Sequence, residues 1–234
     1  ENKNNNNNDD SNDIKAFKWY KVKIDGLPER IWHTCNIISN DDNEFKMVVV
    51  CGEDKSTYLQ NDIFVLNCKN GNILDSKCWS VNKISDIPWG FKPRYGHISH
   101  FISMKKYENN SIQYNIIVNG GYAGDLGFLN DWWLITLEYH KNEYTIKTCK
   151  EFVPNKLSIK DNTKDSIPKK YGFSSNIVSF NNGKTTQNTI VQYGGQLMNF
   201  MRYDKINVFS IELNEWIKMK KIQKKNNKPN NTQS

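Results

Sequence analysis

The chain has 234 residues and a formal net charge of +7, and 37% of its residues are hydrophobic. No run approaches the roughly 18 apolar residues of a membrane-spanning helix, so we expect no membrane segment. The five cysteines are odd in number and never spaced Cys-x-x-Cys, which argues against a disulfide framework. Free cysteines favour a reducing compartment, and we expect the cytoplasm, with the nucleus as the alternative.

The chain opens with residues 1–15, which are polar and rich in asparagine, so we expect them to be disordered. Residues 16–24 follow and contain Phe17-Lys18-Trp19-Tyr20-Lys21-Val22, where apolar and polar side chains alternate. Alternation of this kind is typical of a half-buried β-strand. We therefore expect a strand in residues 16–24, similar in pattern to the strand around Trp216 near the other end of the sequence.

A cassette then recurs three times, in residues 25–84, 85–155 and 156–222. Each copy has a basic residue, an apolar run that ends at glycine, and an acidic or amide residue that opens an alternating strand. From glycine to that last residue the distance is about the same in each copy: 10, 10 and 12 residues (52 to 62, 121 to 131, 195 to 207). The three sets are Arg30, Gly52 and Asp62; Arg94, Gly121 and Asp131; Lys170, Gly195 and Asn207.

Repetition of one pattern along a chain is typical of solenoids and propellers, in which each copy forms one unit of a stack. The hairpin between the first two strands varies in length from copy to copy. Stacked sheets tolerate such variation, because an insertion at a loop tip leaves the paired strands untouched. The repeat therefore predicts an all-β fold.

The cassette resembles the kelch repeat, in which each copy forms one four-stranded blade of a β-propeller. In that family a diglycine ends the second strand and a tryptophan lies in the fourth. Two copies have the diglycine, at Gly120-Gly121 and Gly194-Gly195, whereas the first has Cys51-Gly52. Trp79 and Trp216 stand at the tryptophan position, and the second copy has only the strand-like residues 144–148 there.

The resemblance implies a kelch-type β-propeller with three four-stranded blades, at 25–84, 85–155 and 156–222. Residues 16–24 would be the fourth strand of a preceding blade, since the third copy supplies its own. Three blades and one strand do not close a ring, because propellers have about four to eight blades. We therefore expect part of a larger ring, closed by remaining blades of the same chain or by a second copy. Residues 223–234 are expected to form a disordered basic tail.

Motifs that would carry catalysis are not found in the sequence: no nucleophile elbow, phosphate-binding loop or dinucleotide fingerprint occurs. His97 and His100 are three residues apart, which places them on opposite faces of a strand and prevents them from sharing a metal. His33 and His97 occupy equivalent positions, and Phe173 stands there in the third copy, so we read this position as packing. We predict no catalytic residue, metal or cofactor.

A partner-binding site follows from the resemblance. In kelch domains that bind acidic peptides, the basic residue that opens the first strand points into the mouth of the channel, and residues after the diglycine form its rim. An alternative is that the basic residues pair with an aspartate of a neighbouring blade, such as Asp62 or Asp131, and fasten the ring. Carried over by position, the resemblance implies partner-binding roles for Arg30, Arg94, Lys170, Tyr122, Asp125, Gln196, Met198 and Arg202, with Glu53 and Asp54 on the same rim.

We expect a non-catalytic protein-interaction module that recognises a protein or acidic peptide, as a substrate adaptor or as the regulatory domain of a larger protein. One alternative is a regulatory kelch segment of an enzyme such as a Ser/Thr phosphatase. Another is a propeller that binds a small ligand or is itself catalytic. The positive charge also suits RNA, but lysine and asparagine are enriched along the whole chain. We attribute the charge to this composition and predict no nucleic-acid partner.

Overall fold

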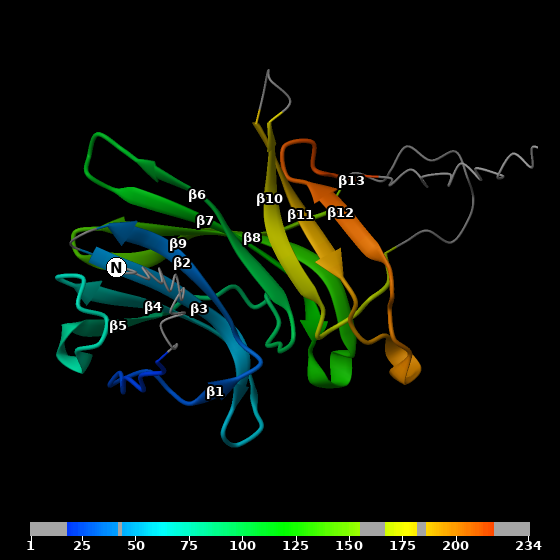
Figure 1. Ribbon diagram of the computed structural model, residues 1–234, viewed down its shortest axis with the longest axis horizontal. Helices are drawn as coiled ribbons and strands as arrows, with labels where there is room; N and C mark the ends of the chain where they lie inside the picture. The colour runs from blue at the N-terminus through cyan, green and yellow to red at the C-terminus, as the bar shows by residue number, and fades with distance from the viewer. Residues whose placement is uncertain (1–17, 42–43, 155–166, 182–185, 218–234) are drawn as a thin grey trace, which may run out of the picture.

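The computed structural model describes residues 18–41, 44–154, 167–181 and 186–217. These residues form thirteen strands and three short 3-10 helices, which confirms the all-β class. The strands make three antiparallel sheets that follow one another along the chain (Figure 1). Within the described part of the chain, no helix is long and apolar enough to be a candidate membrane span.

The first sheet lies within residues 25–84, the first copy of the repeat. Its first two strands both pair with β3, one with each half of that strand, and β4 and β5 follow in order on the other side. The 3-10 helix η1 (Ser76–Cys78) leads into the last strand, which begins at Trp79 and so contains the tryptophan that the repeat places there. The strands are β1 (Arg30–Ile31), β2 (Thr34–Asp41), β3 (Glu44–Asp54), β4 (Leu59–Lys69) and β5 (Trp79–Ile84).

The second and third sheets lie within the second and third copies, and each is a four-stranded meander in chain order. The second sheet consists of β6 (Ile98–Lys106), β7 (Ile112–Tyr122), β8 (Phe128–His140) and β9 (Glu143–Phe152), with η2 (Gly124–Leu126) between β7 and β8. The third sheet consists of β10 (Ser174–Asn181), β11 (Thr186–Tyr193), β12 (Ile206–Ser210) and β13 (Glu215–Ile217), with η3 (Met198–Phe200) between β11 and β12.

The strand predicted in residues 16–24 is wrong for the residues that are described there. Residues 18–24 form no strand, and Trp19 is 97% exposed. A strand needs a neighbour for its backbone hydrogen bonds, and none of the three sheets pairs with this segment. Ile24 and Leu27 instead pack on the outer face of the first sheet. The predicted lead at 1–15 and tail at 223–234 lie outside the described residues.

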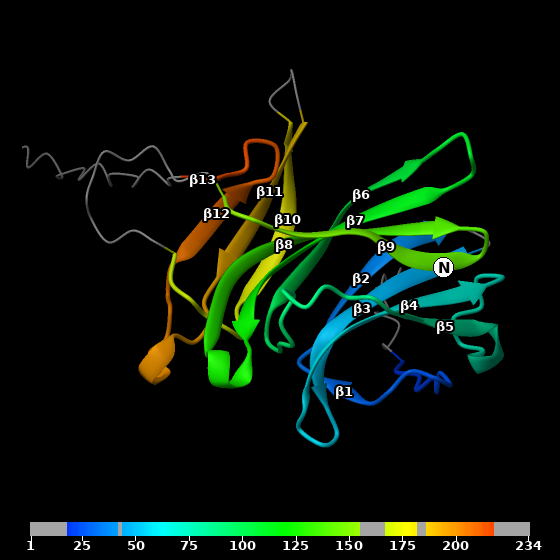
Figure 2. The same ribbon diagram turned by 180° about the vertical axis from the view of Figure 1, so that it is seen from behind.

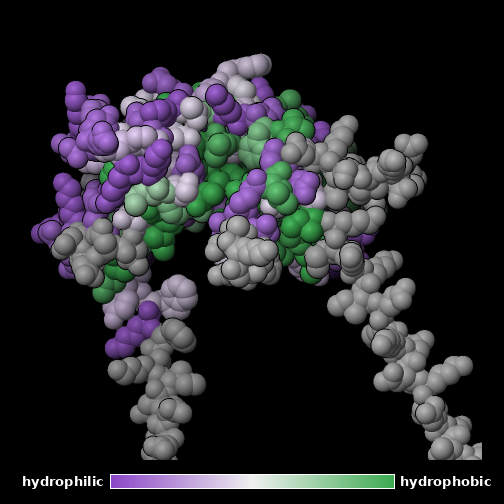
Figure 3. All heavy atoms as spheres, turned by 90° about the horizontal axis from the view of Figure 1, so that it is seen from above, coloured by the Kyte–Doolittle hydropathy of each residue, from purple (hydrophilic) through white to green (hydrophobic). Residues whose placement is uncertain are grey.

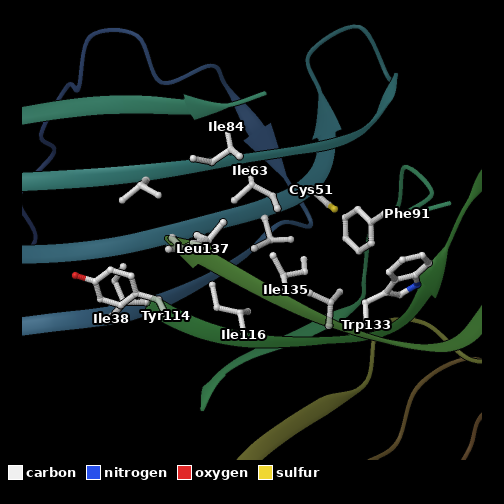
Figure 4. Close-up of a cluster of buried hydrophobic side chains, with 14 residues drawn as sticks. Ile38, Cys51, Ile63, Ile84, Phe91, Tyr114, Ile116, Trp133, Ile135 and Leu137 are labelled. Carbon is white, nitrogen blue, oxygen red and sulfur yellow. The ribbon is translucent and has the colours of Figure 1, made fainter. Parts of the chain in front are cut away.

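The second sheet buries both of its faces, because side chains alternate along β8. Trp133 and Ile135 belong to the hydrophobic cluster shared with the first sheet. In Figure 4 Ile135 faces Ile63 of the first sheet, and Trp133 lies beside Phe91. Trp132 points the other way and packs against Phe209 of the third sheet, with 4.4 Å between ring centroids. The sheets are thus stacked face to face in chain order.

The outer face of the third sheet is less covered. Tyr193 and Ile206 lie opposite each other on β11 and β12, and both are exposed. Ile206 has the opposite orientation to Phe209, three residues along the same strand, which packs on the second sheet. In the view from above, hydrophobic residues form a band through the middle of the molecule and hydrophilic residues gather at the left (Figure 3).

The glycine that ends β7 has a steric reason to be glycine. Gly121 has φ +101, and a Cβ there would lie 2.8 Å from the carbonyl oxygen of Tyr95. The residue before it, Gly120, is also left-handed with φ +67. In the first sheet Cys51 keeps a left-handed φ of 55 although it has a side chain. The backbone conformation is therefore the repeated feature, and Cys51 adopts it at some cost in strain.

Candidate functional site

One end of the molecule contains one loop from each sheet. These loops are the β3–β4 turn, the loop with η2 and the loop with η3, and all three lie along the lower edge in both Figure 1 and Figure 2. We call this edge the loop end. The β6–β7 hairpin of the second sheet lies at the opposite end (Figure 1).

Backbone hydrogen bonds join neighbouring sheets at the loop end. The amide of Gly52 donates to the carbonyl of Arg94 over 2.9 Å, and the amide of Gly121 donates to the carbonyl of Lys170 over 3.1 Å. A second series runs from Gly172 to Gly96 over 2.7 Å, and from Gly96 to Trp32 over 3.1 Å. The repeated glycines and basic residues thus hold the three sheets at fixed spacing.

The two arginines of the predicted site are occupied within their own sheets. Arg94 has 0% side-chain exposure and donates to both carboxylate oxygens of Asp131, over 2.7 and 2.8 Å. Arg30 pairs in the same bidentate way with Asp62. The predicted partner-binding role of these arginines is wrong in this arrangement, because neither guanidinium is free or accessible. The arginines do pair with the two aspartates that the alternative names, but each aspartate belongs to the same sheet as its arginine and not to a neighbouring one, so these pairs do not fasten one sheet to the next.

Lys170 occupies the third basic position and differs from both arginines. It is buried, with 2% exposure, and its Nζ has no hydrogen-bond partner among the described residues. The ammonium lies 4.5 Å from the ring centroid of Phe173 and 4.7 Å from that of Tyr203. Desolvation by burial lowers the pKa of Lys170 to about 8. The predicted contact between Lys170 and a partner therefore requires a ligand to pass Tyr203 and reach the ammonium.

The position of the paired aspartate shifts in the third sheet. In each of the first two sheets, the residue two positions before the glycine at the repeat position (Gly52 or Gly121) lies opposite a residue of the next strand. The aspartate directly precedes that opposite residue. The residue that precedes the third such pair is Lys205, so the alignment on Asn207 is wrong by two residues. The longer spacing of 12 residues in the third copy was the signal for this shift. The three opposed pairs are Val50 with Ile63, Asn119 with Trp132, and Tyr193 with Ile206.

Five aromatic side chains from all three sheets meet at the loop end, and we call them the aromatic cluster. Tyr95 is central: its ring centroid is 5.3 Å from that of Tyr122 and 5.7 Å from that of Tyr171. Phe128 stacks on Tyr171 at 5.1 Å, and Trp32 lies 6.3 Å from Tyr95. Desolvation raises the pKa of the Tyr95 hydroxyl. The cluster forms a half-buried, amphipathic floor.

The predicted rim residues lie around this floor. Tyr122 belongs to the cluster, and Gln196 accepts a hydrogen bond of 3.1 Å from the hydroxyl of Tyr171. Asp125, Met198 and Arg202 are exposed in the loops of the second and third sheets. Their side chains are accessible, and their role in binding stays a prediction.

The first-sheet rim is mostly structural. Asp54 accepts from the backbone amides of Ser56 and Tyr58 over 2.8 and 3.0 Å, and from the side chain of Gln60. These hydrogen bonds lower the pKa of Asp54 and stabilise the β3–β4 turn. Glu53 approaches Tyr95 closely enough that its charge raises the tyrosine pKa.

Two histidines lie at the contacts between sheets. The Nε2 atom of His97 is 2.8 Å from Oγ1 of Thr34 in the first sheet, and Nε2 of His100 is 2.7 Å from Oγ of Ser175 in the third. Burial lowers the pKa of His97 to about 3 and that of His100 to about 4. Among the described residues, no group of three His, Cys, Asp or Glu side chains could hold a metal ion.

Several residues of the loop end were missed from the sequence. The clearest are Tyr95 and Tyr171, each of which directly follows the basic residue of its repeat. Their equivalence was a usable signal, because Tyr95 pairs with Tyr122 as Tyr171 pairs with Gln196. Phe200, in the apolar loop segment 198–201, was not among the residues predicted to contact a partner.

Comparisons with known proteins name no family. No family model matches this sequence, and no curated protein matches it. A solved structure titled "Structure of YjhT" aligns with 82% of this chain and 46% of its own, with a TM-score of 0.38 and 11% identity. The aligned part thus spans less than half of that protein, and a likeness this distant carries no argument about function.

Proposed function

We propose that the chain is a segment of a kelch-type β-propeller that binds an acidic segment of a protein partner at the loop end. The aromatic cluster carries this proposal. Trp32, Tyr95 and Tyr171 come from three different copies of the repeat, and their rings lie close together. Large amphipathic rings of this kind supply much of the binding energy in protein interfaces, since they bury apolar area and keep a polar group.

Backbone strain at the loop end supports a binding role. Trp32 is 57% exposed with φ 55, and Phe200 is 87% exposed with φ 60. A bulky residue at positive φ is costly, and surrounding structure must hold it there. Because both rings are largely exposed, burial inside the protein does not offset this backbone strain. Contact with a partner would supply that burial.

Positive charge at the third sheet favours an acidic partner. Lys170 is a buried cation without a carboxylate, and its Nζ lies 4.7 Å from the ring centroid of Tyr203. Arg202 and Lys205, on either side of Tyr203 in the sequence, are exposed. Asp204 is the one exposed acid within residues 198–205. Arginine binds carboxylates in a bidentate manner, and lysine contributes a point charge.

Site-specific photocrosslinking tests this function. A benzoylphenylalanine at position 200 should capture a partner, and the same group at Tyr107 should not, because Tyr107 follows β6 in the hairpin at the opposite end. Phe200→Ala should weaken the captured complex at least tenfold, as expected of a hot-spot residue. Equal capture at both positions, or no effect of Phe200→Ala, would remove the loop end from consideration.

The ring itself has a separate test. Exposed Tyr193 and Ile206 give the outer face of the third sheet an apolar surface that another blade would cover. We expect light scattering to detect concentration-dependent association of the chain through this face. Tyr193→Lys should keep the chain monomeric, whereas Tyr107→Lys, at the opposite end, should not. A chain that stays monomeric and stable at all concentrations would contradict the need for a larger ring.

A further inference from the structure

The basic residue of the repeat has one of two environments: it is paired with a carboxylate in the first two sheets and unpaired in the third. In the first two sheets an arginine is neutralised by an aspartate of its own sheet: Arg30 by Asp62, and Arg94 by Asp131. In the third sheet the residue that takes the place of the aspartate is Lys205, as the strand register shows. The third sheet therefore has a buried ammonium at the basic position and a second positive charge where the others have a carboxylate.

The surroundings of Lys170 suit a carboxylate. Its Nζ is buried and has no partner in the described residues, and aromatic rings of Phe173 and Tyr203 flank it. Arg94 sits in the same way over Phe91, at 4.7 Å, and there the carboxylate completes the arrangement. A cation beside an aromatic ring thus recurs in both sheets, although the ring comes from a different position in each, and in the third sheet the acidic side chain is replaced.

A second unpartnered donor lies next to the same tyrosine. The hydroxyl of Tyr203 donates to Oδ1 of Asn207 over 2.8 Å, whereas Nδ2 of Asn207 is buried and has no partner among the described residues. Buried donors without acceptors are costly and uncommon in native structures. Lys170 and Asn207, which both neighbour Tyr203, would each gain an acceptor from one carboxylate.

We propose that the third sheet binds a ligand carboxylate at Lys170, in the place that Asp62 and Asp131 hold in the first two sheets. The ammonium of Lys170 and the amide of Asn207 donate to the two oxygens, and the carboxylate enters beside Tyr203, which is half-buried. This inference rests on the proposed function in one respect: the carboxylate then belongs to an acidic side chain of the partner. A free small carboxylate is the other source.

The test replaces the ligand with an internal aspartate. Lys205→Asp restores the acid at the position equivalent to Asp131, and Lys205→Asn is its uncharged control. Lys77→Asp, in η1 of the first sheet, controls for the change in net charge. Thermal unfolding of the full chain is measured in sodium acetate and in sodium chloride at the same ionic strength.

The wild-type chain and the Lys205→Asn and Lys77→Asp variants should unfold at a higher temperature in acetate than in chloride. Lys205→Asp should lose this difference and unfold at a higher temperature than Lys205→Asn in chloride. Lys170→Met should also lose the acetate response. An equal acetate response in Lys205→Asp and Lys205→Asn, or no response in the wild-type chain, would overturn the proposal.

A hexaglutamate peptide separates the two sources of the carboxylate. If a partner supplies it, hexaglutamate should bind the wild-type chain in calorimetry, acetate should compete, and Lys205→Asp should bind at least tenfold more weakly. An acetate response without hexaglutamate binding would assign the site to small carboxylates and overturn the partner's role in it. Photocrosslinking at Phe200 is independent of this result, so failure of the proposed function and failure of this site are distinguishable.

Discussion

The second and third sheets share a repeat but differ in how completely they are enclosed. The second sheet packs on both faces, through Trp133 on one side and Trp132 on the other, and its Arg94 is fully paired. The third sheet packs on one face, exposes Tyr193 and Ile206 on the other, and leaves Lys170 without a partner. The same pattern can therefore build a closed structural unit or one that keeps unsatisfied groups at the loop end.

This contrast separates two roles of a buried cation. A buried cation that pairs with a carboxylate stabilises its own sheet. Removing either partner leaves an unpaired buried charge, which lowers the free energy of unfolding. A buried cation without a carboxylate lowers the stability of the free protein, and a ligand that pairs with it restores that stability. Removing the carboxylate in the second sheet and removing the unpaired cation in the third should therefore have opposite effects on the free energy of unfolding.

The largest effect is expected from Asp131→Ala. This change leaves the guanidinium of Arg94 buried without its carboxylate, and it should lower the free energy of unfolding by about 3–5 kcal/mol. The change also removes an acceptor from Nε1 of Trp133, which donates to Asp131 over 2.7 Å. Urea unfolding measures the loss. The double variant Arg94→Met with Asp131→Leu should recover much of it, and a single-variant loss under 1 kcal/mol would contradict the contrast.

A pH-dependent effect should appear in acid, where the contacts between sheets weaken. The folded chain holds the pKa of His97 at about 3 and that of His100 at about 4, both below the ordinary 6.5. Below pH 6.5 the unfolded chain therefore binds more protons than the folded one. Stability falls as the pH falls from 6.5 toward these values, by up to about 1.4 kcal/mol per pH unit for each histidine.

The variants His97→Phe and His100→Gln isolate the two contacts. His97→Phe copies the third repeat, where Phe173 holds the equivalent position, and it should flatten the acid slope between pH 6.5 and about 3. His100→Gln should act in the same direction at the contact with the third sheet, down to about pH 4. Urea unfolding at several pH values gives both slopes, and slopes equal to that of the wild-type chain would place the acid sensitivity elsewhere.

The smallest effect is expected from Lys170→Met, with the opposite sign to Asp131→Ala. Methionine keeps much of the packing without a buried charge, so the variant should be more stable at pH 7 by on the order of 1 kcal/mol. The folded pKa of Lys170 is about 8, below the 10.5 of the unfolded chain. Wild-type stability therefore rises with pH between about 8 and 10.5 relative to the variant, and the advantage of methionine should vanish near pH 10. A variant less stable than wild type at pH 7 would show that Lys170 is already paired.

Much of the fold follows from the sequence, because the features that define it are local and periodic. The three sheets lie in the three predicted copies, and the turns at Gly121 and Gly195 keep the positive φ that glycine allows. The strand predicted at 16–24 failed for the opposite reason. Alternation reports a side-chain pattern, and a strand also needs a neighbouring backbone, which no local pattern contains.

The candidate site was harder to predict. The repeat correctly placed Arg94 near the loop end. It did not show whether the guanidinium contacts a partner or Asp131, because an arginine is suited to either contact. The same alignment placed Asn207 at the aspartate position, and only the strand register shows that Lys205 stands there. Tertiary pairing decides such cases, because a shift of two residues keeps the face of the strand and changes the neighbour.

The backbone bonds between sheets have an evolutionary consequence. The carbonyls of Arg94 and Lys170 receive the amides of Gly52 and Gly121, and none of these four groups depends on the identity of a side chain beyond the glycines themselves. Substitutions in the β3–β4 turn, in η2 or in η3 can therefore accumulate without altering the spacing between the loops. A lineage could exchange one ligand for another by varying the loops one at a time, while inheriting the same frame.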